Sequence, residues 1–110
     1  MSIFKEIIEG RMPADKVYED DDIIAIKDIA PKAPVHILII TKKDYSSLHD
    51  IPDEELGIIK DIAKVAKTLA EKFSIQEGYR LITNVGPDSG QEIKHLHFHL
   101  IGGKKLGSMA

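Results

Sequence analysis

The sequence contains no cysteine, which excludes disulfides, thiolate metal ligands and a cysteine nucleophile. It also lacks long apolar runs: the longest purely aliphatic stretch, Ile37–Ile40, is far too short to span a membrane. The first residues, Met1–Glu6, include an acidic side chain and no apolar signal segment. Basic residues are not in excess, since 15 lysines and arginines face 18 acidic residues and the net charge is -3. We therefore expect a cytoplasmic protein that binds neither membranes nor specific nucleic acid.

What is present is the composition of one globular domain over residues 1–110, with 43% hydrophobic and 30% charged residues. Apolar residues at helical spacing predict a short helix over 3–9 and a long helix over 53–73. Strand-like runs, rich in β-branched residues or alternating, predict five strands over 17–19, 23–28, 35–41, 79–84 and 95–101. The predicted fold class is α+β, a largely antiparallel five-stranded sheet with one long and one short helix.

Three of the five histidines alternate within five residues, at His95, His97 and His99. Because side chains two residues apart on a strand share a face, these imidazoles are predicted to line one face. Such a row serves two kinds of site. Imidazoles at alternate positions can bind a metal, with His36 as a fourth ligand, or a neutral imidazole can attack phosphorus. The loop Gly86–Gln91 favours the second, because its glycines let backbone N–H groups form an anion cradle that a metal site does not need.

The segment His95–Leu100 resembles the His-x-His-x-His motif of the histidine triad (HIT) superfamily. Further segments resemble the Hint branch of this superfamily, in the expected order, over roughly residues 2–107. These segments are Phe4–Ile8, Tyr18–Asp20, Asp28–Pro31, Ala33–His36, Gly78–Arg80, Asn84 and Gly90–Gln91. The resemblance implies a HIT-like fold and a homodimer in which the two sheets run together. Residues 79–84 are apolar enough to form an interface strand.

The resemblance also implies a purine nucleoside phosphoramidase. Such a hydrolase cleaves the P–N bond of adenosine or other purine nucleoside 5'-phosphoramidates, or cleaves acyl-AMP, to the nucleoside monophosphate. His97 would attack the α-phosphorus and form a covalent nucleotidyl-histidine, which water then hydrolyses. His99 would contact the phosphate and help to move a proton to the leaving amine. His95 would orient His97, and His36 would hydrogen-bond within the same relay.

The remaining site residues follow from the same resemblance, and the expected ligand is a purine nucleotide of the AMP or GMP type. Asn84 would hold the phosphate or the leaving group, and Gly90 with Gln91 would supply the anion loop. Asp28 would accept hydrogen bonds from the ribose hydroxyls. The wall of the base pocket would consist of apolar side chains from several segments: Ile3, Phe4, Ile7, Ile26, Ile29 and Leu38. Histidine can protonate the leaving nitrogen near neutral pH, so we expect neither a metal nor another cofactor.

Glu92 departs from the pattern, because animal Hint proteins have a serine at this position, and the resemblance places it among the binding residues. A carboxylate beside a phosphate is unfavourable when both are charged. The Glu92 carboxylate therefore either turns away from the phosphate, so that only the backbone N–H of Glu92 contacts it, or contacts a cationic leaving group. Two other functions stay open from the sequence: a dinucleoside polyphosphate hydrolase, and a nucleotide-binding regulatory protein with incidental activity.

Overall fold

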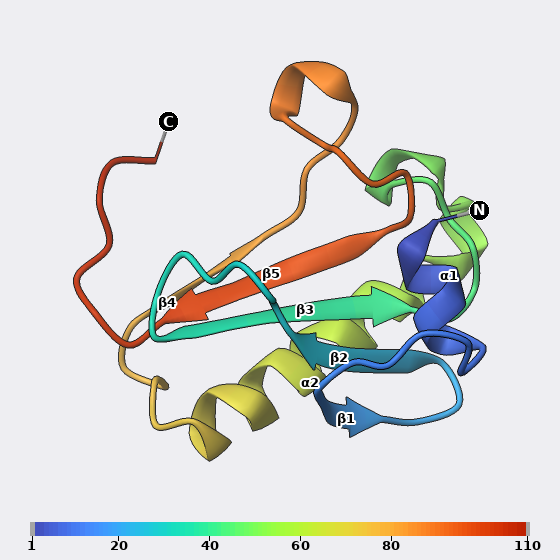
Figure 1. Cartoon of the computed structure of the whole chain (residues 1–110). Helices are drawn as coiled ribbons and strands as arrows, with labels where there is room; N and C mark the ends of the chain where they lie inside the picture. Colours follow the sequence, from blue (N-terminus) through green and yellow to red (C-terminus); the bar gives the residue numbers. More distant parts are fainter. Residues whose placement is uncertain (1, 110) are drawn as a thin grey trace.

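The computed structural model describes residues 2–109, which form one five-stranded sheet with a helix on each face (Figure 1). The spatial order of the strands is β1-β2-β3-β5-β4, and every pair of neighbours is antiparallel. The strands are β1 (Lys16–Glu19), β2 (Ile23–Lys27), β3 (Val35–Thr41), β4 (Tyr79–Ile82) and β5 (His97–Gly102). The helices are α1 (Ile3–Ile8) and α2 (Gly57–Lys72), and 3-10 turns cover Leu48–Asp50, Asp53–Glu55 and Pro87–Ser89. The predicted α+β class and antiparallel sheet are confirmed.

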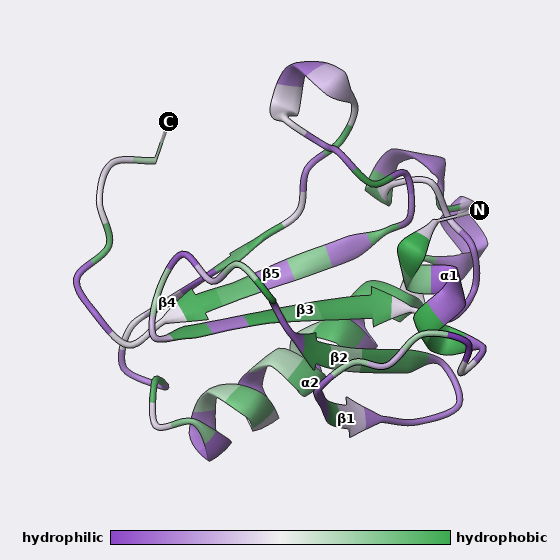
Figure 2. Ribbon diagram, viewed as in Figure 1, coloured by the Kyte–Doolittle hydropathy of each residue, from purple (hydrophilic) through white to green (hydrophobic). Residues whose placement is uncertain are grey.

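One face of the sheet packs against α2 and forms the main core. The strand residues that point to this face include Ile37 and Ile39 of β3 and Phe98 and Leu100 of β5, all at most 8% exposed. They meet the apolar stripe of α2, in which Leu69 is 1% exposed. Figure 2 shows the same pattern, with hydrophobic segments of α2 behind hydrophobic strands. The alternation of the strands therefore commits every second residue of β3 and β5 to this core.

The opposite face is only partly covered. Near the start of β5, α1 places Phe4 and Ile7 on a second apolar cluster with residues of β2 and β3: Ile24, Ile26, Leu38 and Ile40. Farther along the same face, β5 carries partly exposed polar side chains and β3 carries a buried one, and both strands show hydrophilic segments within otherwise hydrophobic stretches in Figure 2. His97, His99 and His36 belong to this uncovered part. The short helix thus closes one end of the face and leaves His97 and His99 partly accessible, with His36 buried beside them.

The long helix begins later than predicted. Residues 53–55 form a separate 3-10 turn after Pro52, and α2 runs over Gly57–Lys72, with Phe73 at its C-cap. The backbone N–H groups of Glu55, Leu56 and Ile59 each bond to the carbonyl three residues earlier, which makes the entry tighter than an α-helix. The first residues of the predicted helix, 53–55, therefore form a 3-10 turn. Within residues 2–109, no helix is long and apolar enough to cross a membrane.

The predicted last strand also begins too early. Pairing of β5 with β3 starts at His97, opposite Ile40, so His95 lies in the preceding bend and not in the histidine row. The reason is that the N–H of Leu96 bonds to the carbonyl of Tyr45, outside the β3–β5 ladder, at 2.7 Å. The predicted strand over 79–84 is likewise shorter and ends at Ile82. A row of two histidines, not three, therefore faces the open side.

Candidate active site

The histidine row lies in a depression of about 510 Å³ on the open face of the sheet. It unites residues that are far apart in the sequence, and those that the sequence had predicted are Phe4, Asp28, His36, Leu38, Asn84, Gly90, Gln91, Glu92, His97 and His99. Other residues of this lining were not predicted: Ala30, Lys32, Ile82, Ile93, Ile101 and Met109. Met109 belongs to the C-terminal segment that runs beyond the end of β5 (Figure 1).

Five predicted residues do not line this depression. His95 is 1% exposed and lies beneath the surface. Ile7 and Ile26 lie in the cluster behind Phe4 and Leu38 and support the wall from inside. The other two, Ile3 and Ile29, are elsewhere: Ile3 borders a neighbouring depression, and Ile29 is 97% exposed on the loop after β2. The apolar wall within this chain is therefore narrower than predicted.

His97 is held in one tautomer by a backbone carbonyl. Its Nδ1 lies 2.7 Å from the carbonyl oxygen of His95. A carbonyl only accepts, so Nδ1 carries the proton and Nε2 keeps its lone pair. The ring also lies edge-on to the Phe4 ring, with centroids 4.9 Å apart. Thr83 Oγ1 donates to the carbonyl of His97 at 2.7 Å and fixes the backbone below the ring. These contacts leave a neutral nucleophilic nitrogen free.

His99 and His36 form a second, directional chain of hydrogen bonds. The backbone N–H of Lys32 donates to His36 Nδ1 at 3.0 Å, so the proton of neutral His36 sits on Nε2. His36 Nε2 lies 2.9 Å from His99 Nδ1 and donates to it. His99 Nδ1 is then an acceptor, and the ring carries its own proton on Nε2. This chain of hydrogen bonds therefore leaves His99 with an N–H donor at Nε2, which is directed to neither His36 nor Lys32.

Burial keeps these three imidazoles neutral. Desolvation, with further lowering by the neighbouring His97 and His36 and a smaller opposing effect of Asp28, brings the pKa of His99 down to about 4. Desolvation is also the main cause that lowers the pKa of His97 and that of His36. At neutral pH the free site thus combines a neutral imidazole at His97, which is the form that can attack phosphorus, with a neutral imidazole hydrogen-bond donor at His99.

Asp28 stands at the edge of this chain, at the end of β2. Its Oδ1 accepts the backbone N–H of Ala30 at 2.8 Å, which fixes the carboxylate in a tight turn. Its Oδ2 lies 3.4 Å from His36 Nε2. The carboxylate therefore borders the depression in a defined orientation, where it can accept hydrogen bonds from a ligand.

Asp28, His36 and His99 also form the one cluster of potential metal ligands within residues 2–109, with ligand atoms within 4.8 Å of one another. The hydrogen bonds argue against a metal there. His36 would have to bind through Nε2, but the N–H of Lys32 occupies Nδ1 as a donor and leaves the proton on Nε2. Metal binding at Nε2 would move the proton of His36 to Nδ1, where this N–H would point at the N–H of Lys32. The residues do not fit a metal in this arrangement.

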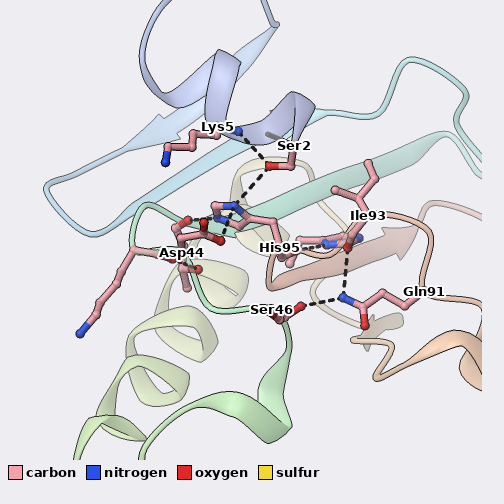
Figure 3. Close-up of polar contacts among 10 residues, drawn as sticks. Ser2, Lys5, Asp44, Ser46, Gln91, Ile93 and His95 are labelled. Atoms are coloured by element: carbon pink, nitrogen blue, oxygen red, sulfur yellow. Dashed lines mark hydrogen bonds and ion pairs between the residues drawn. The ribbon is translucent and has the colours of Figure 1, made fainter.

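The loop upstream of the histidines differs in detail from the predicted anion cradle. The N–H groups of Gly90 and Gln91 donate within the loop, to the carbonyls of Pro87 and Gly86 at 3.0 and 3.3 Å. The Gln91 side chain is also used: it accepts the N–H of Gly86, and it donates to the carbonyls of Ser46 and Ile93 (Figure 3). The loop borders the depression, but the N–H groups of Gly90 and Gln91 and the Gln91 side chain are used to hold the shape of the loop itself.

His95 is fixed from both ring nitrogens. Nε2 donates to the carbonyl of Thr41 at 2.6 Å, and Nδ1 lies 3.5 Å from the hydroxyl of Ser2, which also caps α1 through Lys5 N–H (Figure 3). Asp44 Oδ1 lies 3.6 Å from the same Nδ1. The side chain of His95 thus anchors the bend, and the backbone carbonyl of His95 orients His97. The hydrogen-bond partners of the histidines that the sequence missed, such as Lys32 N–H and Thr41 O, are backbone atoms, so no residue type marks them.

Comparison with known proteins gives consistent relatives over almost the whole chain. The family model for the HIT domain matches residues 9–106. A purine nucleoside phosphoramidase of Escherichia coli K12 is 43% identical over 109 residues, covering 98% of this chain and 92% of that protein. A histidine triad protein from Clostridium difficile is 47% identical with a TM-score of 0.94, covering 99% of this chain and 96% of that one. A HIT family hydrolase from Legionella pneumophila is 41% identical with a TM-score of 0.94, covering 97% and 96%.

Proposed function

The chain belongs to the HIT family, and we propose that it is a hydrolase that cleaves purine nucleoside 5'-phosphoramidates, or acyl-AMP, to nucleoside monophosphates. The observation that carries this proposal is the neutral His97, whose Nδ1–H is bound to the His95 carbonyl while Nε2 stays free in a depression. The phosphoramidase of Escherichia coli at 43% identity supports the P–N bond as the target. The Asp28 carboxylate at the edge of the depression supports a nucleoside as the other half of the substrate.

In the first step, His97 Nε2 attacks the α-phosphorus. The N–P bond to His97 forms as the bond from phosphorus to the amine nitrogen breaks. One proton, taken up with the anionic substrate, reaches the leaving nitrogen from His99 Nε2, so that a neutral amine departs. The bound phosphoryl charge favours this uptake, because it offsets the lowered pKa of His99. Asn84 donates to a phosphoryl oxygen as negative charge develops.

In the second step, water attacks the phosphorus of the nucleotidyl-histidine. The N–P bond breaks, the hydroxyl stays on the nucleoside monophosphate and the proton returns to the His99–His36 chain. Over both steps, one water is consumed and one amine and one monophosphate are formed. We propose that no metal takes part, in line with the His36 tautomer imposed by Lys32 N–H.

The enzyme is further proposed to be a cytoplasmic homodimer joined through β4. This strand pairs with β5 along one edge, and among residues 2–109 no strand pairs with its other edge. Ile82 and Val85, at the end of β4 and just beyond it, are 36% and 42% exposed. Pairing of two such edges would join the sheets of two chains.

Incubation with an adenosine phosphoramidate tests the function. We expect release of AMP and of the free amine by the wild type, and a loss of at least about a thousandfold in kcat for His97→Ala. A wild type that releases no AMP contradicts the proposal, as does a His97→Ala variant that turns over at the wild-type rate. A parallel assay with diadenosine polyphosphates distinguishes the phosphoramidase from a dinucleoside polyphosphate hydrolase, because the latter would cleave the polyphosphates in preference to the phosphoramidate.

A further inference from the structure

The side chain of Gln91 joins three backbone groups from two segments of the chain, and Figure 3 shows the bonds to two of them, Ser46 and Ile93. Oε1 accepts the N–H of Gly86 at 2.8 Å. Nε2 donates to the carbonyl of Ile93 at 3.0 Å and to that of Ser46 at 2.8 Å. Both amide hydrogens and the amide oxygen are thus used within the protein. No donor of this side chain remains for a ligand.

We propose that Gln91 is a positioning residue that clamps the loop of residues 86–93 at the depth needed to contact the phosphate. This inference rests on the function proposed above and refines the part that Gln91 plays in it. Gln91 acts through the loop, which lines the depression with Gly90, Glu92 and Ile93. It does not act as a direct donor to the phosphate.

The loop needs such a clamp because it has little regular structure. It contains one 3-10 turn, Pro87–Ser89, between two glycines with left-handed backbone, Gly86 at φ 79° and Gly90 at φ 91°. Apart from the bonds of the Gln91 side chain, its internal hydrogen bonds all return to Gly86 or Pro87. They close the turn but do not place it relative to the sheet. The bond from Gln91 to Ser46 supplies that placement.

The acceptor side of the clamp is fixed to the nucleophile as well. The carbonyl of Tyr45, next to Ser46, accepts the N–H of Leu96 at 2.7 Å. Leu96 directly precedes His97. Two neighbouring carbonyls of one segment therefore hold the loop through Gln91 and the start of β5 through Leu96. The loop cannot shift relative to His97 unless the bonds of Gln91 break.

Two substitutions of Gln91 break the clamp in different ways, and a third variant controls for charge. Gln91→Ala removes all three bonds. Gln91→Glu keeps an oxygen for the N–H of Gly86 but turns a carboxylate oxygen towards the carbonyls of Ser46 and Ile93, which repels the loop. Gln76→Glu makes the same chemical change at the exposed Gln76, outside the depression.

The first measurement needs no substrate: amide hydrogen exchange of Gly86 by nuclear magnetic resonance. The clamp predicts a fall in protection of about tenfold or more in Gln91→Ala and Gln91→Glu, and wild-type protection in Gln76→Glu. Unchanged protection of Gly86 in both Gln91 variants would overturn the clamp. This outcome is independent of catalysis, so it separates failure of the clamp from failure of the proposed function.

The second measurement compares binding of AMP with binding of adenosine. If the clamp places the loop against the phosphate, both Gln91 variants lose about tenfold in AMP affinity and keep adenosine affinity within about twofold. With the adenosine phosphoramidate, the kcat of both Gln91 variants also falls, by more than their loss of thermal stability would explain. Equal losses for AMP and adenosine, or no loss for either, would contradict the proposal, because a merely structural residue affects both ligands alike.

Discussion

The imidazoles of the site illustrate how single residues acquire their chemistry from neighbours. His97 and His99 are both neutral at neutral pH, because burial lowers the pKa of each. Their roles differ because different backbone groups select their tautomers: the His95 carbonyl frees Nε2 of His97, and Lys32 N–H, through His36, places a proton on Nε2 of His99. The attacking group and the donating group are thus the same residue type in two hydrogen-bond environments.

These lowered pKa values predict the pH dependence of activity. His97 must be neutral to attack, so the acid limb of kcat/KM should lie clearly below pH 6.5, the ordinary pKa of histidine. A pH profile of phosphoramidate hydrolysis checks this. An acid limb at or above pH 6.5 would mean that burial does not lower the pKa of His97 in the free enzyme.

The same groups predict how stability changes with pH. The pKa of His99 is about 4 in the folded protein and near 6.5 when the chain is unfolded, so the unfolded state binds more protons between these values. The contribution of neutral His99 to the free energy of unfolding should be fully present above pH 6.5 and should be lost as the pH drops towards 4. Urea unfolding at several pH values measures this, and His99→Asn should show a smaller fall. An equal fall in the variant would contradict the assignment to His99.

At the scale of elements, each central strand serves the core with one face and the site with the other. Residues of odd number in β3, such as Ile39, pack against α2, whereas Leu38 lies beside Phe4 and lines the depression. The alternation of polar and apolar residues predicted this division for β5, because a strand has only two faces, but the nearly continuous apolar run of β3 does not show it. It could not predict where pairing begins, since that depends on the contact of Leu96 with a distant carbonyl.

Neighbouring substitutions in β3 should separate the two faces. Ile39→Ala should lower the free energy of unfolding by about 2–5 kcal/mol, since it leaves a cavity under α2, and leave KM unchanged. Leu38→Ala should also destabilise the protein but raise KM, by about three- to tenfold, because it removes part of the ligand-facing wall. Chemical unfolding and steady-state kinetics measure both effects. The assignment of faces fails if Ile39→Ala raises KM as much as Leu38→Ala does.

The limits of the sequence are also clear at this scale. The resemblance to the Hint branch implied that Asp28, His36, Asn84 and the histidines meet, and these residues, with the exception of His95, do line one depression. The sequence did not reveal that His95 leaves the row, because an alternating pattern continues through it and only its bond to Thr41 O shows the bend. Contacts through backbone atoms, which have no residue-type signature, account for most of what the sequence left undetermined.

For the whole molecule, the main open feature is the free edge of β4. If two chains pair there, the protein in solution should have twice the mass of one chain. Sedimentation equilibrium over a range of concentrations measures this directly. A single-chain mass at all concentrations up to about 100 μM, well above a typical dimer Kd, would contradict the proposed homodimer.

The central claim for the whole enzyme is that His97 carries the nucleotidyl group between the two chemical steps. Rapid acid-free quenching of a reaction with a slowly hydrolysed adenosine phosphoramidate, followed by mass spectrometry of the digested chain, tests this claim most directly. We predict one adenylyl group on His97, which appears and decays at rates compatible with turnover and is absent from His97→Ala. Turnover by the wild type with no adduct, or with the adduct on His95 or His99, would contradict the account.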